Sequence, residues 1–295
     1  MVLERNKDIS RFSAFKTPAT TEYFFELSVR TEFDELVTVL AKIRELKLPI
    51  VYIASGTNCL FAFDHFPGII VHIAMRDAYF TQENKILYLH AESGVLMGPV
   101  VSESIKTYGV PTLLPWVGLP GTVGGAVVGN AGCFGLETSA IVQSVEVLDT
   151  VTGEVAILKN NEMKYEYRSS ILKGQDRHLV VATTFNLQYL QVDNPFTKMT
   201  IAEMQATRRT KQPPGLSCGS YFTNPSGTSA GKLIDQVGLK GTSVGGMQIS
   251  PHHANFFVSS PGATWQDVLK LAELAKTKVR ETFQIELHEE VRIIK

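Results

Sequence analysis

The chain has 295 residues, 44% of them hydrophobic and 19% charged, so it is long enough for one large domain or two ordinary ones. These proportions argue against disordered, collagen-like and coiled-coil proteins. The formal net charge is -1 and no basic stripe is present, so nucleic acid is not an expected partner. Three cysteines, an odd number in a long chain, favour a reducing compartment over a disulfide framework.

The N-terminal half predicts a mixture of helices and strands. Apolar residues from Phe33 to Leu40 recur at helical spacing, with Thr31 and Asp34 as the expected capping pair and Pro49 as the stop. The remaining predictions are strands at 49–54, 68–73, 86–91 and 178–189, a helix at 95–108, and a hairpin of 142–149 with 153–158.

A polar stretch at 192–197, with Asn194-Pro195, predicts a linker and a domain boundary near residue 195. The order expected after it is helix, glycine-rich loop, helix, strand and helix. The last helix begins with a capping box at 264–267, buries one face, and is followed by a closing strand at 285–294. No signal-like N-terminus and no run of about 18 apolar residues is found, so a cytoplasmic protein without membrane contact is expected.

A turn of small residues directly follows the strand predicted at 49–54. It consists of Ser55, Gly56, Thr57 and Asn58. Successive backbone N–H groups and hydroxyls in such a turn can hold a phosphate. An ordinary turn uses the same residues for conformational reasons, so both interpretations stay open.

The richest glycine segment of the chain covers 118–126 and continues to 135. Its candidate binding residues are Gly118, Gly121, Thr122, Gly124, Gly125 and Ala126. So many glycines indicate that the backbone is approached closely by a ligand or by another element. The segment has neither the dinucleotide fingerprint after a strand nor the lysine of a P-loop. We favour a dinucleotide in a non-Rossmann pocket over a packing loop.

Three further positions carry side chains suited to catalysis. Arg168, beside Tyr167, is able to bind a carboxylate in a bidentate manner, although a surface ion pair would look the same. Ser220 lies outside any nucleophile-elbow pattern, so it is either a proton donor or a turn serine. Glu290 and Arg292 share one face of the closing strand, where solvated charges are the simpler interpretation.

Metal binding and thiol catalysis find little support. His252 and His253 are adjacent, but no further ligands stand at a workable spacing, so no metal is expected. Cys133 and Cys218 lie in glycine-rich surroundings without an identifiable cationic partner. We interpret both as inert small residues.

Taken in order, these segments resemble the UDP-N-acetylenolpyruvoylglucosamine reductase family. The resemblance runs from about Phe12 to the C-terminus. Its matching stretches are 118–137, Tyr167-Arg168, Gln212-Pro213, Gly219-Ser220 with Phe222, Asn224-Pro225, 238–241, 253–256 and 290–292. The segment from 208 to 225 has no long insertion, which resembles the shorter of the family's two types.

The resemblance implies an α+β fold with two domains. Residues 1–194 would form a two-part FAD-binding module of the vanillyl-alcohol-oxidase type, with subdomains of about 1–75 and 76–194. Residues 195–295 would form a smaller α+β substrate-binding domain whose terminal strand, 285–295, returns to the active site. The 55–58 turn would lie near the FAD pyrophosphate and 118–126 would line the rest, which explains the missing Rossmann signature.

The resemblance also implies an activity. NADPH would reduce bound FAD, and hydride would then pass to the vinyl carbon of UDP-N-acetylglucosamine enolpyruvate, giving UDP-N-acetylmuramate for peptidoglycan. The family's proton donor corresponds to Ser220, and the groups that stabilise developing charge correspond to Arg168 and Glu290. Tyr167, Asn224 and Arg292 are the expected substrate-binding residues. The resemblance implies no metal and no obligate protein partner.

The sequence departs from the family pattern at three places. Ala54 stands where the family usually has glycine, 17–20 reads Thr-Pro-Ala-Thr instead of containing a Gly-Gly pair, and Thr223 replaces a lysine. Two other interpretations therefore remain: a flavoenzyme of the same fold that oxidises an alcohol or sugar, and a non-catalytic flavin or nucleotide binder. Ser220, Asn224 and Glu290 favour the reductase over both.

Overall fold

The structure is a computed structural model that describes residues 3–188 and 194–295. The chain divides into two compact units, which are described separately. Unit 1 consists of Met1–Arg5, Tyr23–Ser55 and Pro67–Ala206, and unit 2 of Asn6–Glu22, Gly56–Phe66 and Thr207–Lys295. Tyr189, the predicted end of a strand, and 192–193 of the predicted linker lie outside the described residues.

Some elements have residues in both units. They are β1 (Glu4–Asp8), β2 (Thr20–Leu27), β5 (His65–Ile73) and α4 (Ile201–Lys211). The others in unit 1 are α1 (Phe33–Glu45), β3 (Ile50–Ile53), β6 (Ala78–Glu83), β7 (Ile86–Glu92), α2 (Met97–Lys106), α3 (Val123–Val128), β8 (Gly132–Cys133), β9 (Leu136–Glu137), β10 (Val142–Asp149), β11 (Val155–Lys159) and β12 (His178–Asn186).

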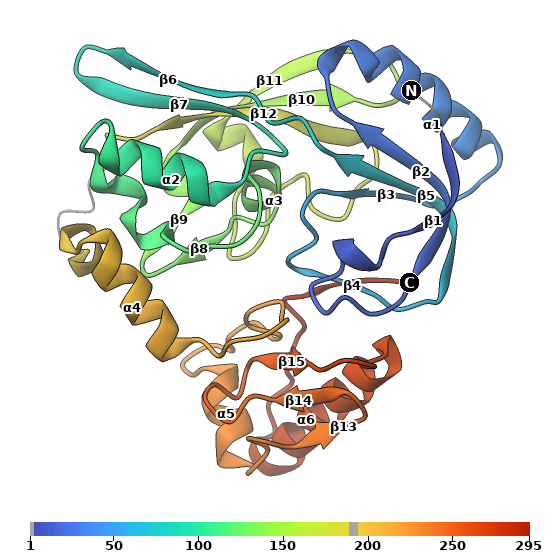
Figure 1. Ribbon diagram of the computed structural model, residues 1–295, viewed down its shortest axis with the longest axis vertical. Coiled ribbons are helices and arrows are strands. Elements are labelled where there is room, and N and C mark those ends of the chain that lie inside the picture. The colour runs from blue at the N-terminus through green and yellow to red at the C-terminus, as the bar shows by residue number, and fades with distance from the viewer. Residues whose placement is uncertain (1–2, 189–193) are drawn as a thin grey trace. The chain divides into compact units, whose positions relative to one another are not determined.

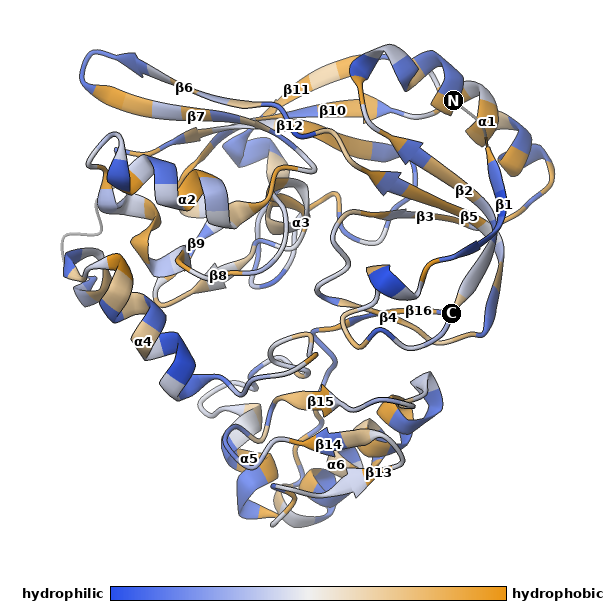
Figure 2. Cartoon of the chain, viewed as in Figure 1, coloured by the Kyte–Doolittle hydropathy of each residue, from blue (hydrophilic) through white to orange (hydrophobic). Residues whose placement is uncertain are grey.

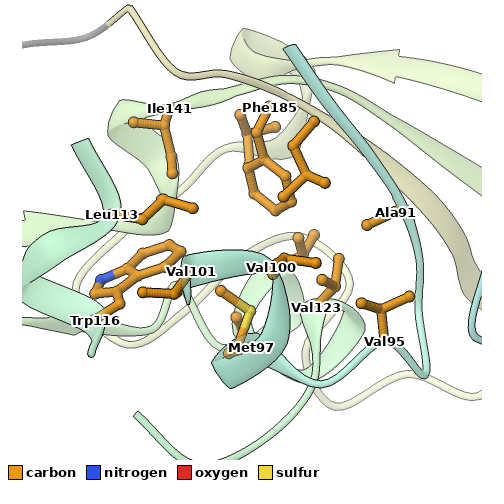
Figure 3. Packing of buried hydrophobic residues seen from close by; sticks show 14 of the residues in the cluster. Ala91, Val95, Met97, Val100, Val101, Leu113, Trp116, Val123, Ile141 and Phe185 are labelled. Atoms are coloured by element: carbon orange, nitrogen blue, oxygen red, sulfur yellow. The ribbon is translucent and has the colours of Figure 1, made fainter. Parts of the chain in front are cut away.

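A five-stranded sheet in the order β11-β10-β12-β7-β6 is the main layer of unit 1. All its neighbouring pairs are antiparallel, and β10 and β11 form the predicted hairpin. Helices α2 and α3 cover one face of this sheet (Figure 1). Figure 3 shows the packing between these layers, in which Phe185 of β12 meets Val100 and Val123 of the helices. This core fixes α3, and with it the glycine-rich segment at its N-terminus.

Helix α1 confirms the periodicity of the sequence and corrects its predicted start. Leu36, Leu40 and Ile43 are buried, and Figure 2 shows hydrophobic and hydrophilic bands alternating along the helix. The capping pair Thr31 and Asp34 is wrong. A 3-10 turn precedes the helix, and the carboxylate of Glu32 instead accepts hydrogen bonds from the N–H groups of residues 28 and 29.

Helix α1 packs its buried face against strands of unit 1, including the parallel pair β3 and β5. These strands belong to a four-stranded sheet in the order β1-β2-β5-β3. The strands predicted at 49–54 and 68–73 are therefore confirmed. Residues 55–58 follow β3 directly, so the buried strand places this turn.

Unit 2 has a small sheet covered by helices. Its elements are β4 (Cys59–Phe61), α5 (Ala230–Gln236), β13 (Ser243–Val244), β14 (Met247–Ile249), β15 (Phe257–Ser259), α6 (Trp265–Phe283) and β16 (Arg292–Ile294). The sheet order is β13-β14-β15, and α5 and α6 bury their apolar faces in the same hydrophobic cluster as these strands. Thr264 and Asp267 make the two reciprocal hydrogen bonds of the predicted capping box of α6.

The end of the chain is less regular than the sequence predicts. Of the strand expected at 285–294, only β16 is regular, and it pairs in parallel with β4. Residues 285–291 are held instead by single contacts to other segments of unit 2, for which strand periodicity gives no signal.

Neither of the two ranges described includes a helix that is long and apolar enough to cross a membrane. The described side chains also include no group of three or more His, Cys, Asp or Glu able to hold a metal ion.

Candidate active site

Two segments of unit 2 that lie far apart in the sequence bring Ser220 and Glu290 to neighbouring positions. The N–H of Glu290 donates to the carbonyl of Tyr221 at 2.8 Å, and Phe222 forms a β-bridge with Glu289. Tyr221 and Phe222 are both fully buried in the hydrophobic cluster of unit 2. Their aromatic side chains therefore anchor the strand-like segment that carries Ser220.

The hydroxyl of Ser220 is available for chemistry. Ser220 is half-buried, and its Oγ makes no hydrogen bond within residues 3–188 and 194–295. The preceding Gly219 has φ +79°, a left-handed conformation that favours glycine and allows the chain to turn before the serine. A half-buried hydroxyl without a protein partner is able to donate to a ligand.

The pKa values of two thiols, Cys59 and Cys218, are shifted by burial and by the charges of the terminal segment. Burial raises the pKa of Cys59 to about 11, and the nearby guanidinium of Arg292 opposes that shift. Burial also raises the pKa of Cys218, and the carboxylate of Glu290 adds to the rise. Glu290 and Arg292 thus face two neighbouring thiols, while Val291 between them is buried, as strand alternation predicts.

We expect Cys59 and Cys218 to be alkylated slowly in the folded protein. A raised pKa leaves less reactive thiolate, so at pH 8 Cys59 should react about 100-fold more slowly than an ordinary thiol, and its rate should rise with pH up to about 11. The measurement is the rate of iodoacetamide labelling in a Cys133→Ser background. Unfolding in urea is the control and should restore ordinary rates; a fast reaction of the folded protein at pH 8 would contradict the account.

Two asparagines of unit 2 are tied to the same region by hydrogen bonds. Asn58 is exposed, and its Nδ2 donates to the carbonyl of Glu290 at 3.1 Å while its own carbonyl accepts from Arg292 N–H at 2.9 Å. The Oδ1 of Asn224 accepts from Ala230 N–H at 3.1 Å, at the start of α5. Asn224 is exposed as well, so its side chain is accessible to a ligand.

Arg168 lies at the tip of a tight turn in unit 1. Glu166 and Ser169 exchange two backbone hydrogen bonds of 3.1 Å, which leaves Tyr167 and Arg168 as the two central residues. Arg168 has φ +57°, a conformation that a non-glycine residue adopts at an energetic cost and that is frequent at functional sites. Its guanidinium donates to the carbonyl of Gly132 at 2.9 Å and lies over the ring of Tyr167, 4.9 Å from the centroid.

The glycine-rich segment of unit 1 combines protein packing with an exposed backbone. Gly124 needs to be glycine because an added Cβ would lie 1.9 Å from Ser93 Oγ. Gly118 and Gly125 are exposed, and Gly118 and Gly121 have φ of +75° and +114°. Thr122 caps α3 by accepting from the N–H of Gly125 at 3.4 Å. The packing interpretation therefore holds at Gly124, while the exposed glycines leave backbone for a ligand.

The 55–58 turn is likewise shaped partly by the protein itself. Gly56 has φ +68°, and an added Cβ would lie 1.7 Å from the carbonyl oxygen of Phe12. Glycine is thus required at position 56 for close backbone packing. Within the two described ranges, the hydroxyls of Ser55 and Thr57 make no hydrogen bond, so both are available to a ligand.

We expect Gly56→Ala to destabilise the protein more than the same substitution at a left-handed glycine that has open space around it. Left-handed strain alone costs about 1–2 kcal/mol, and here the clash with the Phe12 carbonyl adds to it. The matched control is Gly227→Ala in the same unit, where φ is +76° and an added Cβ meets nothing within 4 Å. Urea unfolding measures both losses, and equal losses would show that the Phe12 contact is not decisive.

Comparison with known proteins decides the family. The C-terminal domain profile of UDP-N-acetylenolpyruvoylglucosamine reductase matches residues 210–294. A protein of that name from Chloroflexus aggregans is 36% identical over 298 residues, covering 100% of this chain and 98% of the relative. The chain belongs to the UDP-N-acetylenolpyruvoylglucosamine reductase family. A member from Chlamydia abortus is 33% identical over 99% of this chain and 94% of its own length.

The reductase family assignment extends to the fold. The crystal structure of the Thermus caldophilus UDP-N-acetylenolpyruvylglucosamine reductase matches all of this chain with a TM-score of 0.80 and 26% identity. An FAD-binding-domain profile matches residues 29–159. The chain is therefore an oxidoreductase with an FAD-binding domain, and the α+β fold class expected from the sequence is confirmed.

The donor groups of unit 1 fit an FAD molecule. The hydroxyl of Ser93 is buried, lies under Gly124 and has no hydrogen-bond partner among residues 3–188 and 194–295. The backbone at Gly118 and Gly125 is exposed. A buried hydroxyl without a partner costs free energy unless a ligand satisfies it. No acidic side chain occurs between 118 and 126, so nothing there repels a diphosphate.

The sequence alone did not single out Asn130 of unit 1. Asn130 is 1% exposed, and its amide donates to the carbonyl of Glu166 at 2.9 Å and accepts from Ser139 N–H at 2.9 Å. It thereby supports the turn that carries Arg168. The available signal in the sequence was an asparagine within a glycine run, because asparagine tolerates the left-handed conformation, here φ +43°, better than most residues.

Proposed function

We propose that the chain reduces UDP-N-acetylglucosamine enolpyruvate to UDP-N-acetylmuramate, with FAD as cofactor and NADPH as reductant, in peptidoglycan precursor synthesis. The single observation that carries the proposal is the pairing of the Ser220 segment with the Glu290 segment. These are the residues that the family resemblance assigns to proton donation and charge stabilisation. The full-length match to reductases supports the choice of substrate.

The proposal divides the work between the two parts of the chain. Residues 1–194 hold FAD, through the hydroxyls and backbone of 55–58 and 118–126. Residues 195–295 bind the substrate, and the terminal segment 285–295 supplies Glu290 and Arg292. When bound, FAD supplies the two-electron chemistry, taking hydride from NADPH and delivering it to the vinyl carbon of the enolpyruvyl ether.

In this proposal Ser220 delivers the proton that completes the reduction. Hydride adds to the vinyl carbon, and the electron pair of the double bond moves toward the adjacent carbon and its carboxylate. That adjacent carbon then takes the proton of the Ser220 hydroxyl, and water reprotonates the alkoxide. The free, half-buried hydroxyl of Ser220 supports this role, because it has no protein acceptor to leave within the described parts of the chain.

The charged candidates stabilise the enolate-like species that precedes protonation. The guanidinium of Arg168 binds the substrate carboxylate, and Glu290 polarises the same group. Tyr167, Asn224 and Arg292 contact the remaining substrate. The exposed amide of Asn224 and the exposed side chains of Tyr167 and Arg292 are accessible enough for such contacts. A cytoplasmic location stays a prediction.

A turnover assay tests the proposed function. The FAD-loaded protein is mixed with NADPH and UDP-N-acetylglucosamine enolpyruvate, and the products are identified by mass spectrometry. We expect NADPH oxidation with stoichiometric UDP-N-acetylmuramate, and none with UDP-N-acetylglucosamine, which lacks the enolpyruvyl double bond. NADPH oxidation that is independent of the enolpyruvyl group would contradict the proposal.

A further inference from the structure

The side chain of Asn255 completes the strand pairing of the segment that carries Ser220. Its Oδ1 accepts from the N–H of Phe222 at 2.9 Å, and its Nδ2 donates to the carbonyl of the same residue at 2.8 Å. The backbone carbonyl of Asn255 accepts from the N–H of Tyr221 at 2.8 Å. A primary amide has the donor and the acceptor of a peptide group, so this side chain substitutes for a neighbouring strand.

A side chain is needed here because the neighbouring backbone turns away. Ser220 forms a β-bridge with Phe256, but the N–H of Phe256 bonds back to the carbonyl of His253 at 2.9 Å. Phe222 is fully buried, so its N–H and carbonyl require partners within the protein. Asn255 is itself only 2% exposed, so water does not compete for these hydrogen bonds.

The opposite edge of the same segment holds Glu290. The carbonyl of Tyr221 accepts from the N–H of Glu290 at 2.8 Å, and the N–H of Thr223 donates to the carbonyl of His288 at 2.9 Å. The segment 220–223 therefore lies between Asn255 on one edge and the terminal segment on the other. A shift of its backbone moves Ser220 and Glu290 together.

We propose that Asn255 is a positioning residue of the reductase reaction. Through the peptide groups of Tyr221 and Phe222 it fixes the backbone that orients the Ser220 hydroxyl and the Glu290 carboxylate. It contacts these groups only through that backbone and takes no part in proton transfer. The kinetic consequence rests on the proposed function, whereas the coupling of Asn255 to the Glu290 backbone does not.

The test uses Asn255→Asp in the FAD-loaded protein. Aspartate has the same shape and still accepts from Phe222 N–H, but it places an oxygen against the Phe222 carbonyl. Flavin reoxidation by the enolpyruvyl substrate should slow by about 10–100-fold, as expected for a small displacement of catalytic groups. Flavin reduction by NADPH should be unchanged. Asn255→Leu, which removes both hydrogen bonds, should show the larger effect.

Asn194→Asp is the matched control. Asn194 is 8% exposed, and its amide donates to the carbonyl of Phe134 at 2.8 Å and accepts from the N–H of Phe196 at 3.0 Å. The same chemical change is thus made at a buried bridging asparagine of unit 1. It should lower Tm without changing the ratio of the two half-reactions. An equal fall of both half-reactions in Asn255→Asp would overturn the positioning role.

Hydrogen exchange gives a readout that needs no turnover. In Asn255→Asp the amide of Glu290 should exchange faster, while the amides of β10 and β12 in unit 1 keep their rates. An unchanged exchange rate of the Glu290 amide in Asn255→Asp would overturn the inference. Failure of the wild-type protein to reduce the enolpyruvyl substrate would overturn the proposed function alone. If neither variant folds, the exchange of the Phe222 and Glu290 amides is compared in the wild-type protein. Both should exchange through the same local unfolding event and therefore with the same free energy of opening. Different free energies of opening would overturn the inference.

Discussion

Ser220→Ala is expected to separate the two half-reactions of the enzyme. Flavin reduction by NADPH should stay nearly intact, because the hydroxyl takes no part in it. Reoxidation by UDP-N-acetylglucosamine enolpyruvate should slow by about 10²–10⁴-fold, the usual effect of losing a general acid. Stopped-flow absorbance of the flavin under anaerobic conditions measures both rates. The alanine loses no hydrogen bond described in the protein, so stability should change little.

Ser260→Ala is the control for this experiment. Ser260 is an exposed serine of the same unit. Its backbone N–H donates to the carbonyl of Gly246 at 2.8 Å and its carbonyl accepts from Ala263 N–H at 3.1 Å, while its hydroxyl makes no hydrogen bond within the described ranges. Both half-reactions of the control should match wild type. An equal loss in both half-reactions of Ser220→Ala would mean a defect in binding or folding and would remove Ser220 from the proton-transfer step.

Arg168→Met should have the second largest effect. Methionine keeps an unbranched side chain of similar bulk but removes the charge that binds the substrate carboxylate and stabilises its developing negative charge. The rate of flavin reoxidation should fall by about 10²–10³-fold, comparable to the loss of one strong donor at an oxyanion. Methionine also loses the hydrogen bond from the guanidinium to the Gly132 carbonyl, so the Tm of the variant is measured beside its rates.

Arg177→Met provides the comparison for charge removal. Arg177 is an exposed arginine of unit 1. Its guanidinium nitrogen lies 2.7 Å from a carboxylate oxygen of Asp149, the last residue of β10. Its removal should leave both half-reactions unchanged, since exposed ion pairs contribute little. If Arg168→Met behaved like Arg177→Met, Arg168 would take no part in binding the substrate carboxylate or in stabilising its developing charge.

Much of the fold could be predicted from the sequence, because local patterns encode it. The helix at 265–283 combined an N-terminal capping box with buried positions at helical spacing, and both features are present. The hairpin of β10 and β11 followed from two β-branched runs around a short turn. The sequence did not predict that unit 2 is built from three separate parts of the chain. Residues 6–22 and 56–66 belong to it through tertiary contacts, which leave no periodic signal in the sequence.

The candidate site was predicted less completely than the fold. Glycine 56 and glycine 124 stood out, but the sequence could not distinguish a ligand from the Phe12 carbonyl or the Ser93 hydroxyl that lie against them. The segments that carry Ser220 and Glu290 are joined by contacts such as the β-bridge of Phe222 with Glu289, and the composition of the chain gives no signal for such a pairing. Asn255 belonged to a recognised motif, yet its role required the two side-chain hydrogen bonds that the structure shows.

Anaerobic titration of the wild-type protein tests the central claim most directly. The purified protein is loaded with FAD, bleached with one equivalent of NADPH, and then mixed with one equivalent of UDP-N-acetylglucosamine enolpyruvate. The account predicts rapid return of the oxidised flavin spectrum together with one equivalent of UDP-N-acetylmuramate. A flavin that stays bleached in the presence of this substrate would contradict it.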